Sequence, residues 1–80
     1  MELQVNEDYE LDNLVKDWGF EKFIDWNFNY YYKTDNDGLS VLKIFNDRDV
    51  FIMLKKYHIV DDEILCLLYD LIKAGIIIKV

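Results

Sequence analysis

The chain has 80 residues, an apolar fraction of 52% and a formal net charge of −7. This length suits one small domain spanning residues 1–80, and the apolar fraction argues against intrinsic disorder. The single Cys excludes an intramolecular disulfide, and no signal peptide or transmembrane run is apparent, so we expect a cytoplasmic protein without membrane contact. The negative charge disfavours direct contact with nucleic acid.

The first quarter of the chain is predicted to form an acidic helix that ends at Gly19. Asn6 suits an N-cap, and acidic residues follow it in the first turn. One apolar face carries Leu11, Leu14, Val15 and Trp18. Residues 1–18 contain six acids and one base, a net charge of −5, whereas residues 19–80 contain ten acids and eight bases, a net charge of −2. Residues 20–24 are expected to add another helical turn.

Two strands joined by a turn are predicted next. Aromatic residues alternate with mostly polar ones along residues 26–33, which indicates a strand. Residues 34–38 end in Gly38 and are typical of a turn. Residues 39–45 are apolar on both faces, so we expect a central strand that is covered on both sides and that pairs with residues 76–80.

Two helices and a strand are predicted for the rest of the chain. Asn46 or Asp47 is expected to cap a helix that continues to His58, with its apolar stripe on Val50, Met53, Leu54 and Tyr57. A strongly apolar helix follows over residues 61–74. Gly75 suits the end of this helix, and the three consecutive isoleucines after it favour a strand in the interior of a sheet.

Together these elements predict a small α+β domain in the order α-β-β-α-α-β. An antiparallel hairpin and a C-terminal strand would pack against two or three helices.

No catalytic, metal or cofactor motif survives inspection, so we expect no cofactor and no enzymatic activity. Residues 35–38, Asp-Asn-Asp-Gly, resemble part of a calcium loop, but Lys33 and Ile44 occupy positions where that loop needs an acid and a Glu. His58 and Cys66 are the only residues of their types, and a metal site or a nucleophilic pair needs further partners. Cys66 is expected to be a small core residue.

Residues 50–78 resemble the helix-turn-helix of winged-helix domains. The resemblance lies in two helices joined by a tight turn at residues 58–61, and in the run from Leu68 through Gly75 to Ile77. It covers about a third of the chain and implies DNA binding through the second helix. However, that helix begins Asp61-Asp62-Glu63, which would face the phosphates with three negative charges. The resemblance therefore implies contact with a protein in place of DNA.

The leading functional hypothesis is a small acidic module that binds another protein. Its most concrete form is an inhibitor that occupies a basic, nucleic-acid-binding surface of a partner, as phage-encoded anti-CRISPR, anti-restriction and nuclease-immunity proteins do; the analogy rests on size and charge. The residues expected to bind the partner, by charge or as aromatic anchors, are Glu7, Asp8, Glu10, Asp12, Trp26, Tyr30 and Tyr31. The alternatives are a winged-helix-like, DNA-binding transcription regulator and a homodimeric structural module that buries the apolar surface of helix 61–74.

Overall fold

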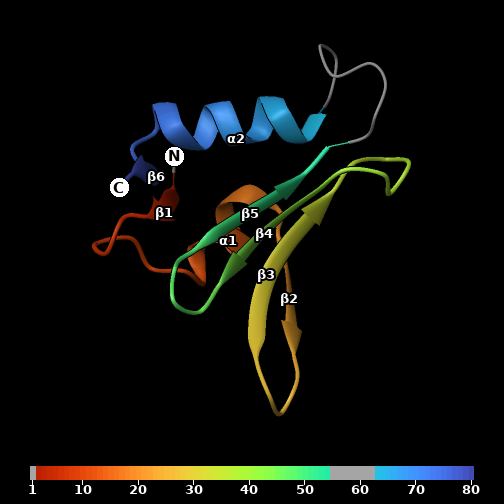
Figure 1. Cartoon of the computed structure of the whole chain (residues 1–80), viewed down its shortest axis with the longest axis horizontal. Coiled ribbons are helices and arrows are strands. Elements are labelled where there is room, and N and C mark those ends of the chain that lie inside the picture. The colour runs from red at the N-terminus through yellow and green to blue at the C-terminus, as the bar shows by residue number, and fades with distance from the viewer. Residues whose placement is uncertain (1, 55–62) are drawn as a thin grey trace.

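The computed structural model describes residues 2–54 and 63–80 and is mostly β-structure. Its elements are β1 (Leu3–Val5), α1 (Asn13–Trp18), β2 (Glu21–Ile24), β3 (Asn29–Thr34), β4 (Val41–Phe45), β5 (Val50–Met53), α2 (Glu63–Lys73) and β6 (Ile77–Lys79). Strands β2, β3, β4 and β5 form an antiparallel sheet in that order (Figure 1). Strands β1 and β6 form a second, two-stranded antiparallel sheet beside the chain ends.

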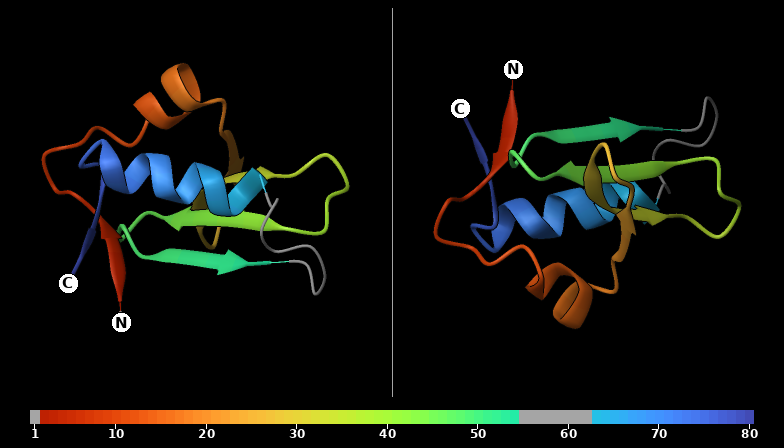
Figure 2. Two further views of the ribbon diagram at one scale, coloured as in Figure 1. Left: turned by 90° about the horizontal axis from the view of Figure 1, so that it is seen from above. Right: turned by 90° about the horizontal axis from the view of Figure 1, so that it is seen from below.

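One face of the four-stranded sheet, here called the inner face, packs on both helices. Residues directly opposite each other on antiparallel strands point to the same face, so Tyr31 of β3, Ile44 of β4 and Val50 of β5 share it. These residues pack in one apolar core with Leu14 of α1 and Leu71 of α2. Figure 2 shows the two helices relative to the sheet. The helices therefore pack on the centre of the inner face, and the outer face carries no described element.

The two sheets are joined through the β4–β5 turn. Gln4 of β1 forms an isolated bridge with Asp49, and the Val5 N–H donates to the carbonyl oxygen of Arg48 at 2.9 Å. Arg48 has a φ of 75°, a left-handed conformation that is uncommon for a residue with a side chain. Its Nη1 donates to the carbonyl oxygens of Asn6 and Tyr9, each at 2.8 Å. This arginine therefore holds the segment of residues 6–12 against the β4–β5 turn.

Helix α2 and its end confirm part of the sequence prediction. Ile64, Leu68 and Leu71 are its buried residues and lie on one face, as the periodicity indicated. Gly75 has a φ of 78°, and the N–H of Ile76 donates to the carbonyl oxygen of Leu71, which ends the helix. Gly19 and Gly38 also have positive φ values, at the end of α1 and in the β3–β4 turn as predicted. The predicted start at Asp61 lies outside the described residues.

The predicted order α-β-β-α-α-β is wrong. Within residues 2–54 and 63–80 the structure has one helix longer than six residues, α2, and six strands that make two antiparallel sheets. The main error concerns the predicted helix from Asn46 or Asp47 to His58, because Val50–Met53 is strand β5 and pairs with β4. Residues 46–49 form the turn of a hairpin, in which the Arg48 N–H donates to the Phe45 carbonyl oxygen at 2.8 Å. The remainder of that predicted helix lies outside the described residues.

This strand also removes the first helix of the winged-helix resemblance, since residues 50–53 are extended. Residues 58–61, the proposed tight turn, lie outside the described part of the chain. The second helix of the resemblance and the strand after it are present as α2 and β6, but β6 pairs with β1, which precedes the region of the resemblance.

Two further elements differ near the N-terminus. Residues 20–24 were expected to form a helical turn, but Glu21–Ile24 is strand β2. Helix α1 begins at Asn13, seven residues after the predicted N-cap at Asn6. The Asn6 side chain instead accepts a hydrogen bond from the Asp8 N–H at 3.0 Å, which stabilises a turn in competition with a helix.

Strands β6 and β4 and the side chain of Cys66 have surroundings that differ from those predicted. Strand β6 pairs with β1 and not with β4, and Ile78 is 39% exposed, so the isoleucine run is not in the interior of a large sheet. Strand β4 is central, as predicted, but only its inner-face residues Leu42 and Ile44 are fully buried. Cys66, expected in the core, is exposed on α2.

Candidate functional site

The outer face of the four-stranded sheet is the most distinctive surface of the molecule. The strand registers place ten residues on it, namely Glu21, Phe23, Tyr30, Tyr32, Thr34, Val41, Lys43, Phe45, Phe51 and Met53. Phe23 is 40% exposed, Phe51 43% and Met53 53%. Apolar side chains of this size are normally buried, and an exposed contiguous group of them marks an interaction surface.

Aromatic rings on the outer face contact one another around Tyr30. Its ring centroid lies 4.9 Å from that of Phe23, 5.9 Å from that of Tyr32 and 5.9 Å from that of Phe45. Phe28, which precedes β3, stacks on Tyr30 at 6.0 Å. The Lys43 ammonium lies 4.8 Å from the Tyr30 ring centroid, within range of a cation–π interaction. We call Phe23, Phe28, Tyr30, Tyr32 and Phe45 the aromatic cluster.

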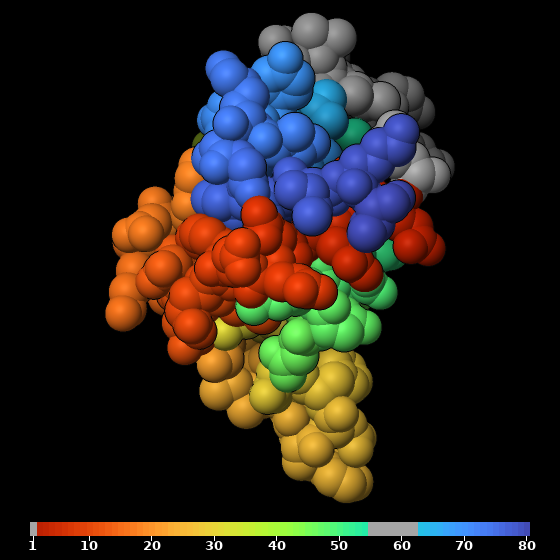
Figure 3. Space-filling view, turned by 90° about the vertical axis from the view of Figure 1, so that its left-hand side faces the viewer, coloured from red at the N-terminus to blue at the C-terminus, as the bar shows by residue number. Residues whose placement is uncertain are grey.

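The turn between β2 and β3, residues 25–28, projects beyond the rest of the molecule (Figures 1 and 3). Trp26 in this turn is 93% exposed, while Ile24 and Phe28 on either side are 70% and 55% exposed. The turn is ordered by the Asp25 N–H, which donates to the Phe28 carbonyl oxygen at 3.1 Å and to Asn29 Oδ1 at 3.2 Å. We call residues 24–28 the hairpin tip; it presents three large apolar side chains to solvent.

An acidic end lies beside this tip. Glu7, Asp8, Glu10 and Asp47 are exposed, and Arg48 joins their two segments through its hydrogen bonds to residues 6 and 9. Figure 3 shows the segment of residues 6–12 and the β4–β5 turn on the same side of the molecule, above the hairpin tip. The four carboxylates and one guanidinium give this end a negative charge.

The residues predicted to bind a partner fall into two groups. Glu7, Asp8, Glu10 and Trp26 are exposed, and Tyr30 is half-buried within the aromatic cluster. Asp12 and Tyr31 instead contact each other: the buried Tyr31 hydroxyl donates to Asp12 Oδ1 at 2.6 Å. Lys22 also donates to that oxygen, at 3.4 Å. This contact ties the start of α1 to the inner face of the sheet.

The electrostatics agree with a structural role for this pair. The Tyr31 hydrogen bond and the nearby Lys22 lower the pKa of Asp12. Burial raises the pKa of Tyr31, and its hydrogen bond to the Asp12 carboxylate raises it further.

On the outer face, the hydrogen bond from the Tyr32 hydroxyl to Glu21 raises the pKa of Tyr32. The partner-binding role of the seven predicted residues stays a prediction.

Sequence reasoning missed most of the aromatic cluster. Phe23, Phe45 and Phe51 share a face with Tyr30 and Tyr32 only once residues 21–24 and 50–53 are recognised as strands. Residues 21–24, Glu-Lys-Phe-Ile, do not alternate between polar and apolar side chains, so no local pattern marked them as a strand.

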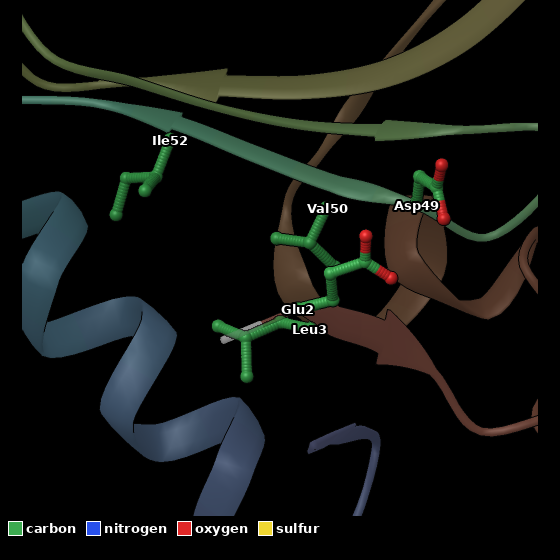
Figure 4. Close-up of a pocket in the computed structure, with 5 residues that line it drawn as sticks. All are labelled: Glu2, Leu3, Asp49, Val50 and Ile52. Atoms are coloured by element: carbon green, nitrogen blue, oxygen red, sulfur yellow. The ribbon is translucent and has the colours of Figure 1, made fainter. Parts of the chain in front are cut away.

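A separate hollow of about 290 Å³ lies between β1 and β5. Leu3, Val50 and Ile52 line it, and the carboxylates of Glu2 and Asp49 lie towards one end (Figure 4). Asp49 accepts a hydrogen bond from the Gln4 amide at 2.8 Å, so its carboxylate already serves the contact between the two sheets. Among the described residues, no group of three or more His, Cys, Asp or Glu side chains is placed to hold a metal ion. None of the described helices is long and apolar enough to span a membrane.

No protein-family model matches this chain, and no curated protein or solved structure matches it either.

Proposed function

We propose that this protein is a small acidic module that binds another protein through its hairpin tip and the adjoining outer face of the sheet. The observation that carries the proposal is the exposure of Ile24, Trp26 and Phe28 on a projecting, hydrogen-bonded turn. Large rigid aromatic side chains are the residues that most often dominate binding energy at protein interfaces. Since the turn is already ordered, binding would cost little conformational entropy.

Charge indicates what kind of partner such a surface would attract. The acidic end adjoins the tip, and the whole chain has a net charge of −7. Opposite charge steers association and like charge opposes it. The partner is therefore a protein with a basic surface, and basic surfaces on nucleic-acid-handling proteins are commonly those that contact phosphate. Occupying such a surface would inhibit the partner, as in anti-CRISPR, anti-restriction and nuclease-immunity proteins.

Direct binding of single-stranded nucleic acid is the competing explanation for aromatic side chains on a sheet. That mode needs a basic groove along the rings. Among the described sheet positions, Lys43 is the one cation on the outer face, and Glu21 lies on the same face. Lys22 and Lys33 lie on the inner face, and both already donate to oxygen atoms of this chain. The charge of the surface therefore favours a protein ligand.

The test is a tagged pull-down from the native host lysate with two variants and a control. Trp26→Ser and Phe28→Ser remove apolar surface from the tip, and Val80→Ser removes an apolar side chain elsewhere that is also exposed. We expect the wild type and Val80→Ser to retain one basic protein that elutes with salt and that loses its own nucleic acid when bound. Capture that is the same for all four proteins would refute a role for the tip.

The acidic end is tested separately by reversing Glu7, Asp8 and Glu10 to Lys. Electrostatic steering acts mainly on the association rate, so we expect slower association with the captured partner and a weaker dependence on salt. An unchanged rate would show that the acidic end does not contribute.

A homodimeric structural module remains a second candidate, and one observation favours it. Glu21 and Lys43 lie in one row on the outer face, separated by Tyr32. In a two-fold symmetric dimer that buried this face, Lys43 of each copy could meet Glu21 of the other. Sedimentation at micromolar concentration tests this arrangement, and a monomer would exclude it.

A further inference from the structure

The outer face contains a hollow of about 360 Å³ between the hairpin tip and the β4–β5 turn. Asn27, Phe28, Asn29, Phe45, Asn46 and Asp47 line it. It therefore joins the aromatic cluster, through Phe28 and Phe45, to the acidic end, through Asp47. Its lining residues are two phenylalanines, three asparagines and one aspartate.

The aromatic side of the hollow is arranged around Tyr30. Phe28 stacks on the Tyr30 ring with an interplanar angle of 20°, while Phe45 meets it edge-on at 63°. The Phe28 ring is therefore nearly parallel to the Tyr30 ring, and the Phe45 ring is steeply inclined to it. The Lys43 ammonium, 4.8 Å from the Tyr30 centroid, shows that this cluster already holds one cation. An aromatic face attracts a cation through its quadrupole, and a planar guanidinium also stacks on it.

The polar side of the hollow supplies acceptors and a negative charge. Asp47 Oδ1 accepts from the Asp49 N–H at 3.0 Å, and a carboxylate has further acceptor capacity at its other oxygen. Asn27 and Asn46 are exposed, and each amide oxygen is an acceptor. No Lys, Arg or His is among the described residues that line the hollow. An anionic ligand would meet an unbalanced carboxylate, whereas a cationic one would be paired.

A guanidinium group can interact with the aromatic side and the polar side of the hollow at the same time. Its five N–H donors lie in one plane and suit carboxylate and amide oxygens, while its two faces suit aromatic rings. An ammonium matches the charge but offers no planar surface. We propose that this hollow receives an arginine side chain of the partner protein. The proposal rests on the proposed function for the existence of that partner, and it names the chemistry by which the partner is recognised.

The choice of arginine also fits the inhibitory mode. Arginine side chains on nucleic-acid-binding surfaces contact phosphate and base edges. An arginine held in this hollow would no longer be free to do so. The exposed tip beside the hollow would cover apolar surface around it and exclude water, which strengthens a charged hydrogen bond.

The test uses short peptides, so it does not depend on finding the partner. Acetylated and amidated Gly-Arg-Gly, Gly-Lys-Gly and Gly-citrulline-Gly are titrated into the ¹⁵N-labelled protein and followed by two-dimensional NMR. We expect saturable shifts for the side-chain amides of Asn27, Asn29 and Asn46 with the arginine peptide. The lysine peptide should bind about fivefold more weakly, because an ammonium cannot stack on an aromatic ring or donate two parallel hydrogen bonds to a carboxylate. The citrulline peptide has no charge on its side chain and should give no saturation.

Asp47→Asn provides the matched variant. The Asn side chain keeps an oxygen for the Asp49 N–H, so the turn is preserved while the charge is removed. We expect arginine binding to weaken about three- to fivefold, the loss typical of one solvent-exposed charged pair. Asp37→Asn, at an exposed acid in the β3–β4 turn, serves as the control and should bind as the wild type does.

Equal binding of the three peptides, or binding that Asp47→Asn leaves unchanged, would overturn the arginine site. Shifts confined to residues 6–12 would also overturn it, since they would show diffuse attraction to the acidic end. Partner capture that tolerates Asp47→Asn but not Trp26→Ser would refute the hollow and leave the proposed function standing. Arginine binding without any captured protein would support the hollow and count against the proposed function.

Discussion

Arg48 is the residue whose replacement tests the architecture most directly. Its Nη1 makes two hydrogen bonds of 2.8 Å to the carbonyl oxygens of Asn6 and Tyr9, which lie 42 and 39 residues away in the chain. A hydrogen bond with one charged partner contributes about 1.5 kcal/mol at the lower end of its range, so Arg48→Ala should cost about 3 kcal/mol. A domain of this length has a free energy of unfolding of roughly 4–12 kcal/mol, so the loss is a large fraction.

The backbone of Arg48 gives a second, independent magnitude. At a φ of 75° an alanine retains the cost of the left-handed conformation, whereas a glycine does not. Arg48→Gly should therefore be about 1 kcal/mol more stable than Arg48→Ala, although both lose the guanidinium. The difference isolates the backbone contribution from the hydrogen bonds.

Urea unfolding monitored by circular dichroism measures both quantities. Lys33→Ala is the matched control, because Lys33 also donates to a carbonyl oxygen, that of Gly19, but through one long contact of 3.4 Å. We expect this control to change stability by less than about 0.5 kcal/mol. If Arg48→Ala cost no more than Lys33→Ala, the reasoning that this arginine joins the N-terminal segment to the β4–β5 turn would be refuted.

Three further predictions follow from burial and charge. Leu42→Ala, at a fully buried inner-face position, should lower the free energy of unfolding by about 3–5 kcal/mol. Val41→Ala on the outer face should lower it by clearly less. Equal losses in urea unfolding would contradict the assignment of the two faces. Burial raises the pKa of Tyr31 above its ordinary value of 10.0, so the unfolded chain loses this proton first and stability falls as the pH rises above 10. Tyr31→Phe should make that fall smaller when unfolding is compared at about pH 9 and pH 11, and an unchanged fall would exclude Tyr31 as its source. Trp26→Ser should leave the free energy of unfolding within about 0.5 kcal/mol of the wild-type value, because the ring is 93% exposed. A larger loss would mean that the hairpin tip packs on the rest of the domain.

Helix α2 was predictable because its signal is local. Ile64, Leu68 and Leu71 recur at helical spacing within the eleven-residue helix Glu63–Lys73, and Gly75 supplies the positive φ that ends the helix. Neither feature depends on what packs against it. The same holds for the turn at Gly38 and for residues 29–33 of the strand predicted over residues 26–33, whereas residues 26–28 lie in the β2–β3 turn.

Strand β5 was missed because its residues form a continuous apolar run. Val50, Phe51, Ile52 and Met53 satisfy a helical stripe and a strand equally well over so short a length. The residues before them, Asn46 and Asp47, occur both at helix N-caps and in hairpin turns. Pairing with β4 decides between the two, since it satisfies the backbone of both strands and places Ile52 on the inner face.

The candidate site shows the same division. Composition and sequence identified an acidic N-terminal segment and an aromatic strand. Trp26, predicted to lie in that strand and to bind a partner, is instead exposed in the β2–β3 turn, and its binding role stays a prediction. Whether Tyr30 or Tyr31 faced solvent depended on the sheet register, and the register put Tyr31 in the core against Asp12. The hollow at Phe28, Phe45 and Asp47 is made by two turns about twenty residues apart, so no local pattern announces it.

The sequence by itself determined the charge of this protein, the amphipathic helix α2 and the three glycine turns, because each depends on side chains that are neighbours along the chain. Only the tertiary structure decided that residues 20–24 and 50–53 are strands, that β6 pairs with β1, and that the aromatic rings gather on one uncovered face. Those outcomes depend on hydrogen bonds and burial between segments far apart in the chain, for which short apolar runs carry no distinguishing period.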